Sequence, residues 1–449
     1  MGYNATHPQF DAAADAIRIV ADFYAGSAAV KDRGETYLPP MRSVAMLRDE
    51  NFIEYLSAYF AYRDRAEVPA YVADAVDKSV GIMHAGPPAI TLPAALERML
   101  DDATGDGTGL AGLMRNINAE QLLSGRVGLA LDAGPDGPVI RMYYGASVRN
   151  WQADGDTFSW VLLGEQTDTV EDYVHKLRDS FRLMALNEDG AFFTETQDAR
   201  GAVIEPAVEP AIRGRKLDRV PFVTINVSDI AADMDKPPLL PLAEKCASIY
   251  RLDADHKHNL HMQSAATLVV SGLIDERDSE GNAKPLRVGA AGLIRTEIGG
   301  DGKFAQPGAE GLSAQQAALD AMHRQARDLG ADMLGNAGAS ESGDALTVRL
   351  SSRTASLRQI AFAGAAGLER ILRMAAEWVG ANPDEVSVTP YTDDTMAGAT
   401  GADLLQIASA ANAGFPISRE AQHWYAKRRG FTPFEFDEEM DRLANQGVP

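Results

Sequence analysis

The sequence predicts an α+β fold of several parts, because helix-rich and strand-rich regions are segregated along the chain. Residues 10–80 carry apolar side chains at helical spacing. Residues 125–230 instead form short β-type segments separated by turn residues. From residue 236 onward, long helical segments return. We therefore expect an N-terminal region of helices and strands, followed by a region dominated by long helices.

Length and composition limit the class of protein. A chain of 449 residues is too long for one compact core, so we expect two or three domains or one elongated subunit. The sequence has no long apolar run that predicts a membrane span, and its N-terminus does not resemble a signal peptide. The single cysteine, Cys246, excludes an intrachain disulfide and a cysteine-based zinc site, and fits a reducing cytoplasm.

The chain is strongly acidic, with a formal net charge of -22 at pH 7 and a pI of about 4.8. Diffuse attraction to nucleic acid needs a basic surface, so this charge excludes that mode of binding. The chain could still touch DNA through local Arg or Lys, or surround DNA without gripping it.

The first helices follow from apolar spacing and helix-ending residues. The segment "FDAAADAIRIVADFYAG" ends at Gly26, a plausible C-cap. The next segment, "SVAMLRDENFIEYLSAYFAYRDR", carries an apolar stripe of Phe52, Tyr55, Leu56, Tyr59 and Phe60. A third segment, "YVADAVDKSVGIMHAGPP", ends at its proline pair.

The strand-rich region contains two hairpin signals, Asp154-Gly155 and Asp189-Gly190. The segment "PFVTINV" has the apolar run of a buried strand. Residues 198–220, which are rich in Pro, Gly and charge, predict a loop or crossover.

The longest predicted helix covers residues 236–263, where prolines suit the approach and first turn. A strand at "AATLVVSGLI" follows, then Gly-rich loops and short strands over 275–310. A second helix runs from about Ser313 to Gly335. A third, "SLRQIAFAGAAGLERILRMAAEWVG", has small residues on one face, which permits close helix approach. The tail predicts short helices around a turn.

Two aspartates and three histidines crowd the segment "LDADHKHNLHM" on the longest helix. His256 and His258 lie about 200° apart on a helix, so an intact helix cannot bring both to one ion. Asp255, His258 and His261 form a drifting stripe that could supply three ligands, and a metal-dependent hydrolase is therefore the alternative function. The other interpretations are a polar helix face with Asp–His contacts, or a polar contact between subunits.

The segment "GTGLAG", residues 107–112, matches the dinucleotide-binding fingerprint through Gly107, Gly109 and Gly112. Asp132 even lies about twenty residues further on, where an acidic ribose ligand would be expected. The context disagrees, because a helix and an acidic loop precede the motif instead of a strand. We therefore expect a helix–helix connection here.

Basic residues gather in "IRGRKLDR", residues 212–219, and in "AKRRG", residues 426–430. Each cluster could meet DNA phosphate or an acidic partner, or could simply be a solvated face. No P-loop, H-E-x-x-H or G-x-S-x-G motif is present, and no nucleophile is paired with a base at a recognisable spacing. The candidate DNA- or partner-contact residues are Arg213, Arg215, Lys216, Lys427, Arg428 and Arg429.

An ordered set of segments resembles a divergent branch of tailed-bacteriophage portal proteins. The segments cover most of the chain in order, and the late helix "SLRQIAFAGAAGLERILRMAAEWVG" and the tail belong to them. The segment "LTVRLSSRTA" departs from the family, in which a cleaner Thr-Ala motif is expected. The other matching segments are "GETYLPP", "LLSGRVGLALD", "VRNWQ", "PFVTINV" and "PPLLPLAEKCASIYRLDADHKHNLHM".

The resemblance implies a portal-like elongated subunit, with long stem and tunnel helices and a mixed α/β wing. It also implies a ring, typically of about twelve subunits, at one capsid vertex. Double-stranded DNA would enter and leave through the ring, and terminase and then head–tail adaptor proteins would dock on it within the shell of major capsid protein. The protein would belong to the virion and assemble in the host bacterial cytoplasm. No catalytic residue, cofactor, metal or membrane is implied.

The family's parts map onto four ranges: a helical and β-rich wing region over 1–235, stem helices with an intervening clip over 236–335, a tunnel loop with a long tunnel or crown helix over 336–385, and a C-terminal wing or crown segment over 386–449. The stem helices would occupy 237–263 and 312–335.

The histidine segment then becomes the half of a stem helix that approaches the clip. Histidines at subunit contacts would make ring stability depend on pH between about 5 and 8. The subunit-contact candidates are Asp253, Asp255, His256, His258 and His261.

Overall fold

The computed structural model describes residues 5–264, 267–273, 296–305, 310–334, 343–391, 409, 418–428, 432 and 434–445. It is a mixed helix and sheet protein, as the sequence predicts. The chain forms two compact units. One is built from residues 1–24, 71–243 and 328–449, and the other from 25–70 and 244–327. Among the helices that the structure describes, none is long and apolar enough to cross a bilayer.

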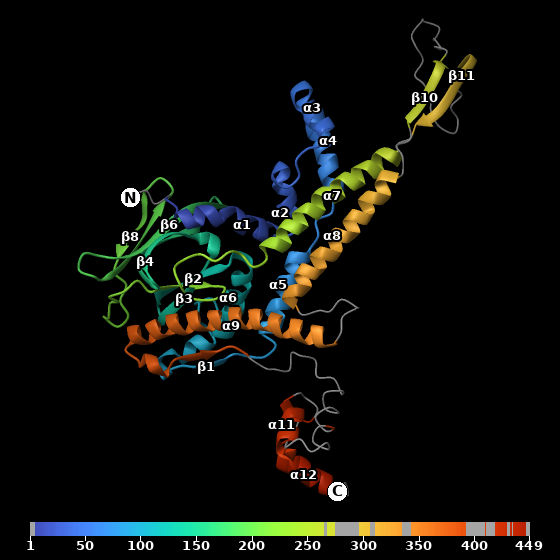
Figure 1. Ribbon diagram of the computed structural model, residues 1–449. Helices are drawn as coiled ribbons and strands as arrows, with labels where there is room; N and C mark the ends of the chain where they lie inside the picture. Colours follow the sequence, from blue (N-terminus) through green and yellow to red (C-terminus); the bar gives the residue numbers. More distant parts are fainter. Residues whose placement is uncertain are drawn as a thin grey trace. The chain divides into compact units, whose positions relative to one another are not determined.

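The larger unit contains a three-stranded and a five-stranded antiparallel sheet (Figure 1). The three-stranded sheet has the order β3-β2-β9, with β2 (Arg126–Gly134) between β3 (Gly137–Tyr144) and β9 (Phe222–Asn226). The five-stranded sheet is a meander of β4 (Val148–Asp154), β5 (Thr157–Glu171), β6 (Val174–Leu186), β7 (Phe192–Asp198) and β8 (Val203–Val208). Short strands β1 (Ala89–Thr91) and β12 (Ser387–Thr389) form a separate pair.

Helices cover the three-stranded sheet in the same unit. The 37-residue helix α9 (Gly343–Val379) packs against β9 and β2, and also against α6 (Leu110–Ser124). Gly364 and Gly367 allow this approach, because an added Cβ would overlap Asn118 at the first position and Ile225 at the second. The predicted small-residue face is therefore confirmed, on a helix that begins well before the expected start. Helices α1 (Pro8–Ala25), α5 (Tyr71–Met83), α11 (Arg419–Arg428) and α12 (Phe436–Asn445) and the short 3-10 helices η2 (Ala94–Leu100), η3 (Gly145–Ser147) and η4 (Pro383–Glu385) complete the described helices of this unit.

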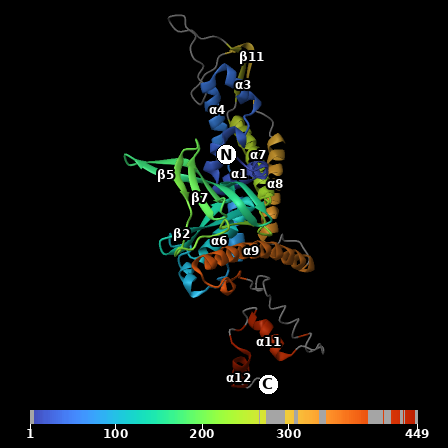
Figure 2. The same cartoon turned by 90° about the vertical axis from the view of Figure 1, so that its left-hand side faces the viewer.

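The hairpin of β5 and β6 extends beyond the rest of its sheet. Pairing of β4 with β5 stops at Leu163, and pairing of β6 with β7 starts at Ser180. Residues 164–171 and 174–179 therefore pair with each other in a two-stranded ribbon. Figure 2 shows this part of the hairpin projecting past the neighbouring strands. We call residues 164–179 the β5–β6 arm.

The smaller unit combines an N-terminal helical segment with a pair of long helices. The segment contains α2 (Ser27–Asp32), the 3-10 helix η1 (Gly34–Thr36), α3 (Arg42–Glu50) and α4 (Phe52–Arg65). The long helices are α7 (Leu240–Ser264) and α8 (Glu310–Leu334), each of 25 residues, most of which belong to this unit. Strands β10 (Thr267–Leu273) and β11 (Thr296–Ala305) form an antiparallel pair between them in the chain.

Most predicted elements are present, with three differences. The segment expected to be a loop or crossover contains strand β8. Residues 168–180, for which no element was expected, belong to β5 and β6. The segment Leu346–Ala355, which departs from the family pattern, is helical within α9. Residues 336–342, at the start of the range expected to hold the tunnel loop, and residues 274–295, most of the expected clip, lie outside the described residues.

Candidate assembly surface and functional residues

Helices α7 and α8 run side by side in opposite directions (Figures 1 and 2). Lys245 Nζ near the start of α7 donates to Gln325 Oε1 at 3.0 Å, and Asn259 Nδ2 near its end donates to Gln315 Oε1 at 3.2 Å. Sequence numbers that rise along one helix thus fall along the other. At about 1.5 Å per residue each helix is roughly 37 Å long. The pair is therefore a long antiparallel hairpin whose connection contains β10 and β11.

The aspartates of the histidine segment bind residues of the N-terminal helical segment in the same unit. The Tyr62 hydroxyl donates to Asp255 Oδ1 at 2.6 Å. Asp253 Oδ2 accepts from the backbone N–H of Glu67 at 2.7 Å and pairs with Lys257 at 3.1 Å. Asp255 thus holds α7 against α4, and Asp253 holds it against the residues that follow α4. Their contacts lie within one subunit.

The three histidines differ in exposure. His256 is 8% exposed, and its Nδ1 finds no hydrogen-bond partner among the residues that the structure describes. His258 packs edge-on against Tyr62, with ring centroids 5.7 Å apart. Burial and the nearby charge of Arg65 lower the pKa of His258, which favours a neutral ring at pH 7. His261 is exposed, and so it is the histidine best placed to reach another molecule.

The structure does not assemble the metal site of the alternative hypothesis. In the part of the chain that the structure describes, which includes Asp255, His258 and His261, no group of three His, Cys, Asp or Glu side chains is placed to hold an ion. Asp255 is instead bound by Tyr62. The drift of the stripe around the helix, at about 60° for each step of three residues, agrees with this separation.

The glycine-rich segment forms a self-contained turn before α6. Asp102 Oδ1 accepts the backbone N–H groups of Gly105 at 2.7 Å and Gly107 at 3.1 Å, and Asp106 Oδ1 accepts that of Thr108 at 3.0 Å. Carboxylates thus occupy the donors that a pyrophosphate would need. The element directly before the turn is the 3-10 helix η2, not a strand. The expected helical connection is confirmed.

Asp132, the would-be ribose ligand, belongs to a half-buried ion pair. Its carboxylate accepts from Arg182, at 3.0 Å for Nη1 to Oδ2, and from Arg141. Burial alone would raise the pKa of Asp132, but the hydrogen bonds and charges of both arginines hold it below its usual value. Tyr143 extends the network, since its hydroxyl accepts from Arg182 at 3.2 Å and donates to Glu165 at 2.5 Å. Nothing in the sequence spacing identifies this network, because its members come from four strands.

The first basic cluster is engaged within its own unit. Arg215 Nη1 donates to the Glu377 carbonyl at 2.9 Å, and the Arg215 carbonyl accepts from the Trp378 indole at 2.9 Å. Lys216 pairs with Glu209. Arg213 is exposed in the tight turn from Ile212 to Arg215, with a φ of 53°. The cluster thus fastens the β8–β9 connection to the end of α9.

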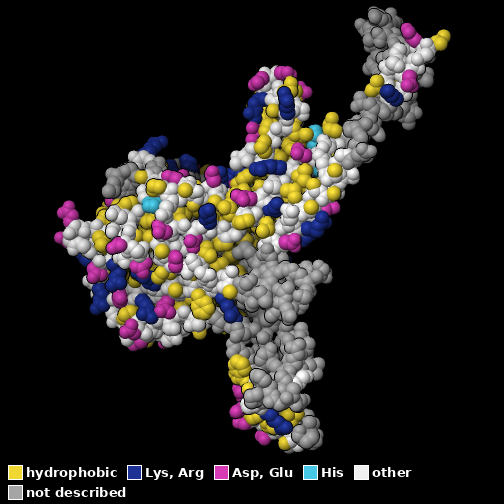
Figure 3. Space-filling view, viewed as in Figure 1, with side chains coloured by type: hydrophobic (Ala, Val, Ile, Leu, Met, Phe, Trp, Pro, Cys, Tyr) yellow, Lys and Arg dark blue, Asp and Glu magenta, His cyan; other side chains and the backbone are white. Residues whose placement is uncertain are grey.

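In the second basic cluster, Lys427 pairs with Glu435. Arg429 lies outside the described residues, as does the side chain of Arg428. On the face shown in Figure 3, Lys and Arg side chains are interspersed with Asp and Glu, with no continuous basic patch. This distribution agrees with a surface that does not grip nucleic acid.

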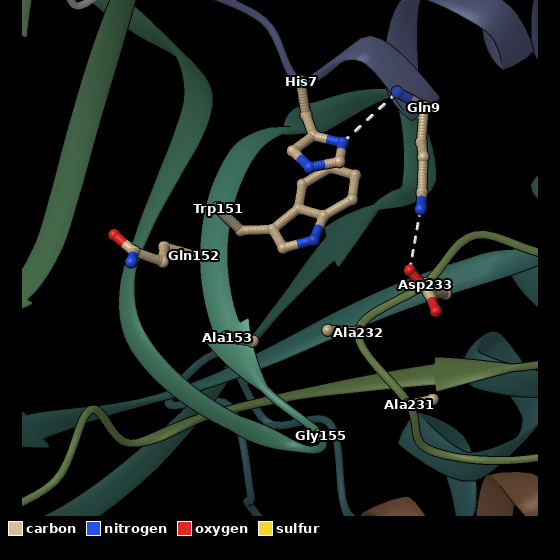
Figure 4. Close-up of a pocket in the computed structure, with 9 residues that line it drawn as sticks. All are labelled: His7, Gln9, Trp151, Gln152, Ala153, Gly155, Ala231, Ala232 and Asp233. Carbon is tan, nitrogen blue, oxygen red and sulfur yellow. Dashed lines mark hydrogen bonds between the residues drawn. The ribbon is translucent and has the colours of Figure 1, made fainter.

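A small cavity of about 360 Å³ lies where His7 and Gln9, among the first described residues, meet β4 (Figure 4). The His7 imidazole stacks on the Trp151 indole, with ring centroids 3.9 Å apart. The buried guanidinium of Arg126 lies 4.0 Å from the same indole, and burial lowers its pKa to about 9. Gln9 Nε2 donates to Asp233 Oδ1 at 2.7 Å. These contacts hold the first residues of the chain against the sheet, and they supply no nucleophile paired with a base.

Comparisons with known proteins give limited matches. Residues 238–379, from α7 through α9, match a family model described as a domain of unknown function (DUF4055). A search of curated proteins gives no match. The chain resembles the neck of a native GTA particle, computed with C12 symmetry, at 13% identity and a TM-score of 0.42, over 86% of this chain and 93% of that one. It also resembles the neck of an empty GTA particle, computed with C6 symmetry, at 14% identity and a TM-score of 0.41, over 89% and 98%. Scores this low leave the function to be argued from the chain itself.

Proposed function

We propose that the chain is a portal subunit, which forms a ring at one vertex of a tailed-phage capsid. DNA would pass through the ring during packaging and ejection, and terminase and head–tail adaptors would dock on it. The observation that carries the proposal is the α7–α8 hairpin: two antiparallel helices of 25 residues whose connection contains the β10–β11 pair. The portal-like sequence pattern expects such a pair, with a clip between its helices, in this part of the chain.

The surface chemistry supports a ring around DNA. A ring of subunits that each carry a net charge of -22 would present a surface that attracts few DNA phosphates, so DNA could slide through it. The basic clusters do not oppose this, since Arg215, Lys216 and Lys427 are paired within the subunit. Any contact with DNA would then be local and few in number.

The exposed apolar side chains of the smaller unit support contacts between copies. Ile53 on α4 is 80% exposed, Phe52 beside it is 59% exposed, and Met46 on α3 is 62% exposed. Large apolar side chains gathered on one helical pair are typical of a surface that another molecule covers. A ring of head-to-tail contacts that closes would cover such a surface in every subunit. Within α7, the exposed His261 is the histidine that we propose to face a neighbour.

Native mass spectrometry of the purified full chain tests the proposal. A dodecamer would have twelve times the 48.1 kDa mass of one chain, about 577 kDa, and negative staining would show rings with a central hole. Another closed ring number would preserve the proposal and correct the stoichiometry. A 48.1 kDa monomer at every salt concentration and pH tested would refute it.

A further inference from the structure

A histidine caps the N-terminus of α1, and its side chain can do so only in the neutral form. The His7 carbonyl accepts the backbone N–H of Asp11 at 3.1 Å, and His7 Nδ1 accepts that of Gln9 at 3.2 Å (Figure 4). The usual capping side chains offer an oxygen that remains an acceptor near neutral pH. Protonation of the His7 imidazole would instead convert Nδ1 from an acceptor into a donor. The cap is therefore lost when the ring becomes charged.

The surroundings of His7 also disfavour a charged ring. The imidazole stacks on Trp151, with ring centroids 3.9 Å apart, and the Arg126 guanidinium lies 4.0 Å from the centroid of the same indole. Arg126 is fully buried, and its Nε and Nη1 find no hydrogen-bond partner among the residues that the structure describes. A charged His7 would thus place two cations against one indole, and it would do so at the positive end of the α1 dipole.

Two carboxylates act in the opposite direction. Asp11 lies one turn further along α1, and Asp233 lies in the connection between β9 and α7. Burial and the charge of Arg126 lower the pKa of His7, and they outweigh the two aspartates, which raise it. Arg149 on β4 adds another cation to this region, and its backbone carbonyl accepts the His7 N–H at 2.9 Å. The closed contact therefore favours a neutral His7.

The residues around His7 also fasten the connection that leads into α7. We call residues 5–9 the N-terminal strap. Gln9 Nε2 donates to Asp233 Oδ1 at 2.7 Å, and Gln9 Oε1 accepts the backbone N–H of Met234 at 3.1 Å. The strap thus binds β4 through its backbone and the β9–α7 connection through Gln9. Loss of the cap that orients Gln9 would weaken both contacts.

We propose that His7 makes the N-terminal strap pH-sensitive: when its imidazole takes up a proton, the strap leaves β4 and the connection into α7. Release uncovers Trp151, which is only 6% exposed while the strap is closed. It also frees the residues that precede α7. All of these contacts lie within one subunit, so the inference goes beyond the ring proposed above and does not depend on it.

The direction of the pH effect follows from proton linkage. Above the ordinary histidine pKa of about 6.5, the His7 ring is neutral in both the closed and the open strap, and the contact has its full strength. As pH falls below this value, the open strap binds the proton first, because the closed contact lowers the pKa of His7. The contact therefore weakens with acid, and the loss levels off below the lowered pKa of the closed state.

Hydrogen-exchange mass spectrometry of the full chain at pH 7.5 and 5.5 tests the proposal, with rates corrected for the intrinsic pH dependence of exchange. Both values lie above the pI of about 4.8. The amides of residues 7, 9 and 234 lose their partners when the strap opens. Peptides that contain them should exchange about threefold to tenfold faster at pH 5.5, where a free imidazole is charged about ten times more often than neutral. Equal exchange at both pH values would overturn the proposal.

A matched pair of histidine substitutions identifies the group that titrates. His7→Asn supplies a capping oxygen that does not titrate in this range, so exchange of the strap should change less than about twofold between the two pH values. His175→Asn, at an exposed histidine in the same unit, should keep the response of the wild type. A wild-type response in His7→Asn would show that another group controls the strap, and the proposal would fail.

Asp233→Asn tests the charge argument with the His7 ring in place. The amide keeps a side-chain oxygen for Gln9 but removes a negative charge that favours the charged imidazole. The strap of this variant should therefore open more strongly with acid, so the ratio of its exchange rates at pH 5.5 and 7.5 should exceed that of the wild type. A ratio equal to or below that of the wild type would contradict control by the charge of His7.

Discussion

Glu120 gives the most quantitative prediction, because it is a carboxyl buried without a cationic partner in the contacts that the structure describes. It lies on α6, is 6% exposed, and accepts the Gly145 backbone N–H at 2.8 Å through Oε1. Burial raises its pKa from 4.5 to about 7. Glu120→Gln keeps the accepting oxygen and nearly the same shape but removes the charge. We therefore expect the variant to be more stable than wild type at neutral and alkaline pH.

The size and sign follow from proton linkage. As pH rises from 4.5 to about 7, the unfolded chain loses the Glu120 proton while the folded chain keeps it, so the wild type loses stability across this window. At 1.36 kcal/mol per pKa unit, the whole window is worth about 3 kcal/mol. Between pH 5.5 and pH 8.5 the free energy of unfolding of the variant, relative to wild type, should therefore grow by about 2 kcal/mol.

Urea unfolding of both proteins, followed by tryptophan fluorescence at intervals from pH 5.5 to 8.5, measures this difference. The range stays above the pI of about 4.8, where an acidic protein loses solubility. Titration of every other group cancels in the comparison. Glu97→Gln, a change at an exposed glutamate in the same unit, controls for the altered net charge. A difference that stays constant across the range would refute the burial argument.

Three further substitutions test the packing described above. Arg182→Met leaves the half-buried Asp132 without its main partner, and we expect urea unfolding to show a loss of about 3–5 kcal/mol. Gly367→Ala forces a methyl group into Ile225 where α9 meets β9, and thermal unfolding should show a loss of about 1–3 kcal/mol. Tyr62→Phe removes the hydrogen bond to Asp255, and hydrogen exchange of α4 and α7 should show a loss of about 1.5 kcal/mol in local stability.

Each change has a control in the chain. Arg182→Lys keeps a charge beside Asp132 and should cost less than Arg182→Met. Gly330→Ala, on α8, adds a methyl group 3.9 Å from Leu242 and should stabilise by about 0.5–1 kcal/mol. If Gly330→Ala also lowered the stability, alanine would be unfavourable at helical glycines in this chain whatever their packing. A Gly367→Ala variant as stable as wild type would contradict the close approach of α9 to β9. For Tyr62→Phe, unchanged exchange in both helices would remove the proposed link.

The helices were predictable from the sequence because each carries its own local signal. Proline before α7 and the small-residue face of α9 were visible in single segments. The cap expected at Ser313 was wrong, because α8 begins at Glu310 and Ser313 lies inside it. The β5–β6 arm was missed because a ribbon exposed on both faces has no alternation of apolar and polar residues, and its turn lacks the usual Gly or Asn. Strand β8 was missed for a related reason, since its six residues are all exposed.

The functional residues depended on tertiary contacts that spacing cannot reveal. Helix geometry argued against chelation by His256 and His258 together. It could not show that Tyr62 would bind Asp255, 193 residues away in the chain. The same holds for the ion pair of Asp132 with Arg182, which joins different sheets, and for the stack of His7 on Trp151. A sequence search finds clusters of chemistry along the chain, whereas these contacts come from segments that meet only in the fold.

Cryo-electron microscopy of the purified full chain tests the central claim most directly. The account predicts a closed ring in which the α7–α8 hairpins of successive subunits surround a central channel, with the β10–β11 pairs gathered at one end of that channel. A stable monomer under all conditions, or a ring that carries the α7–α8 hairpins away from its channel, would contradict it.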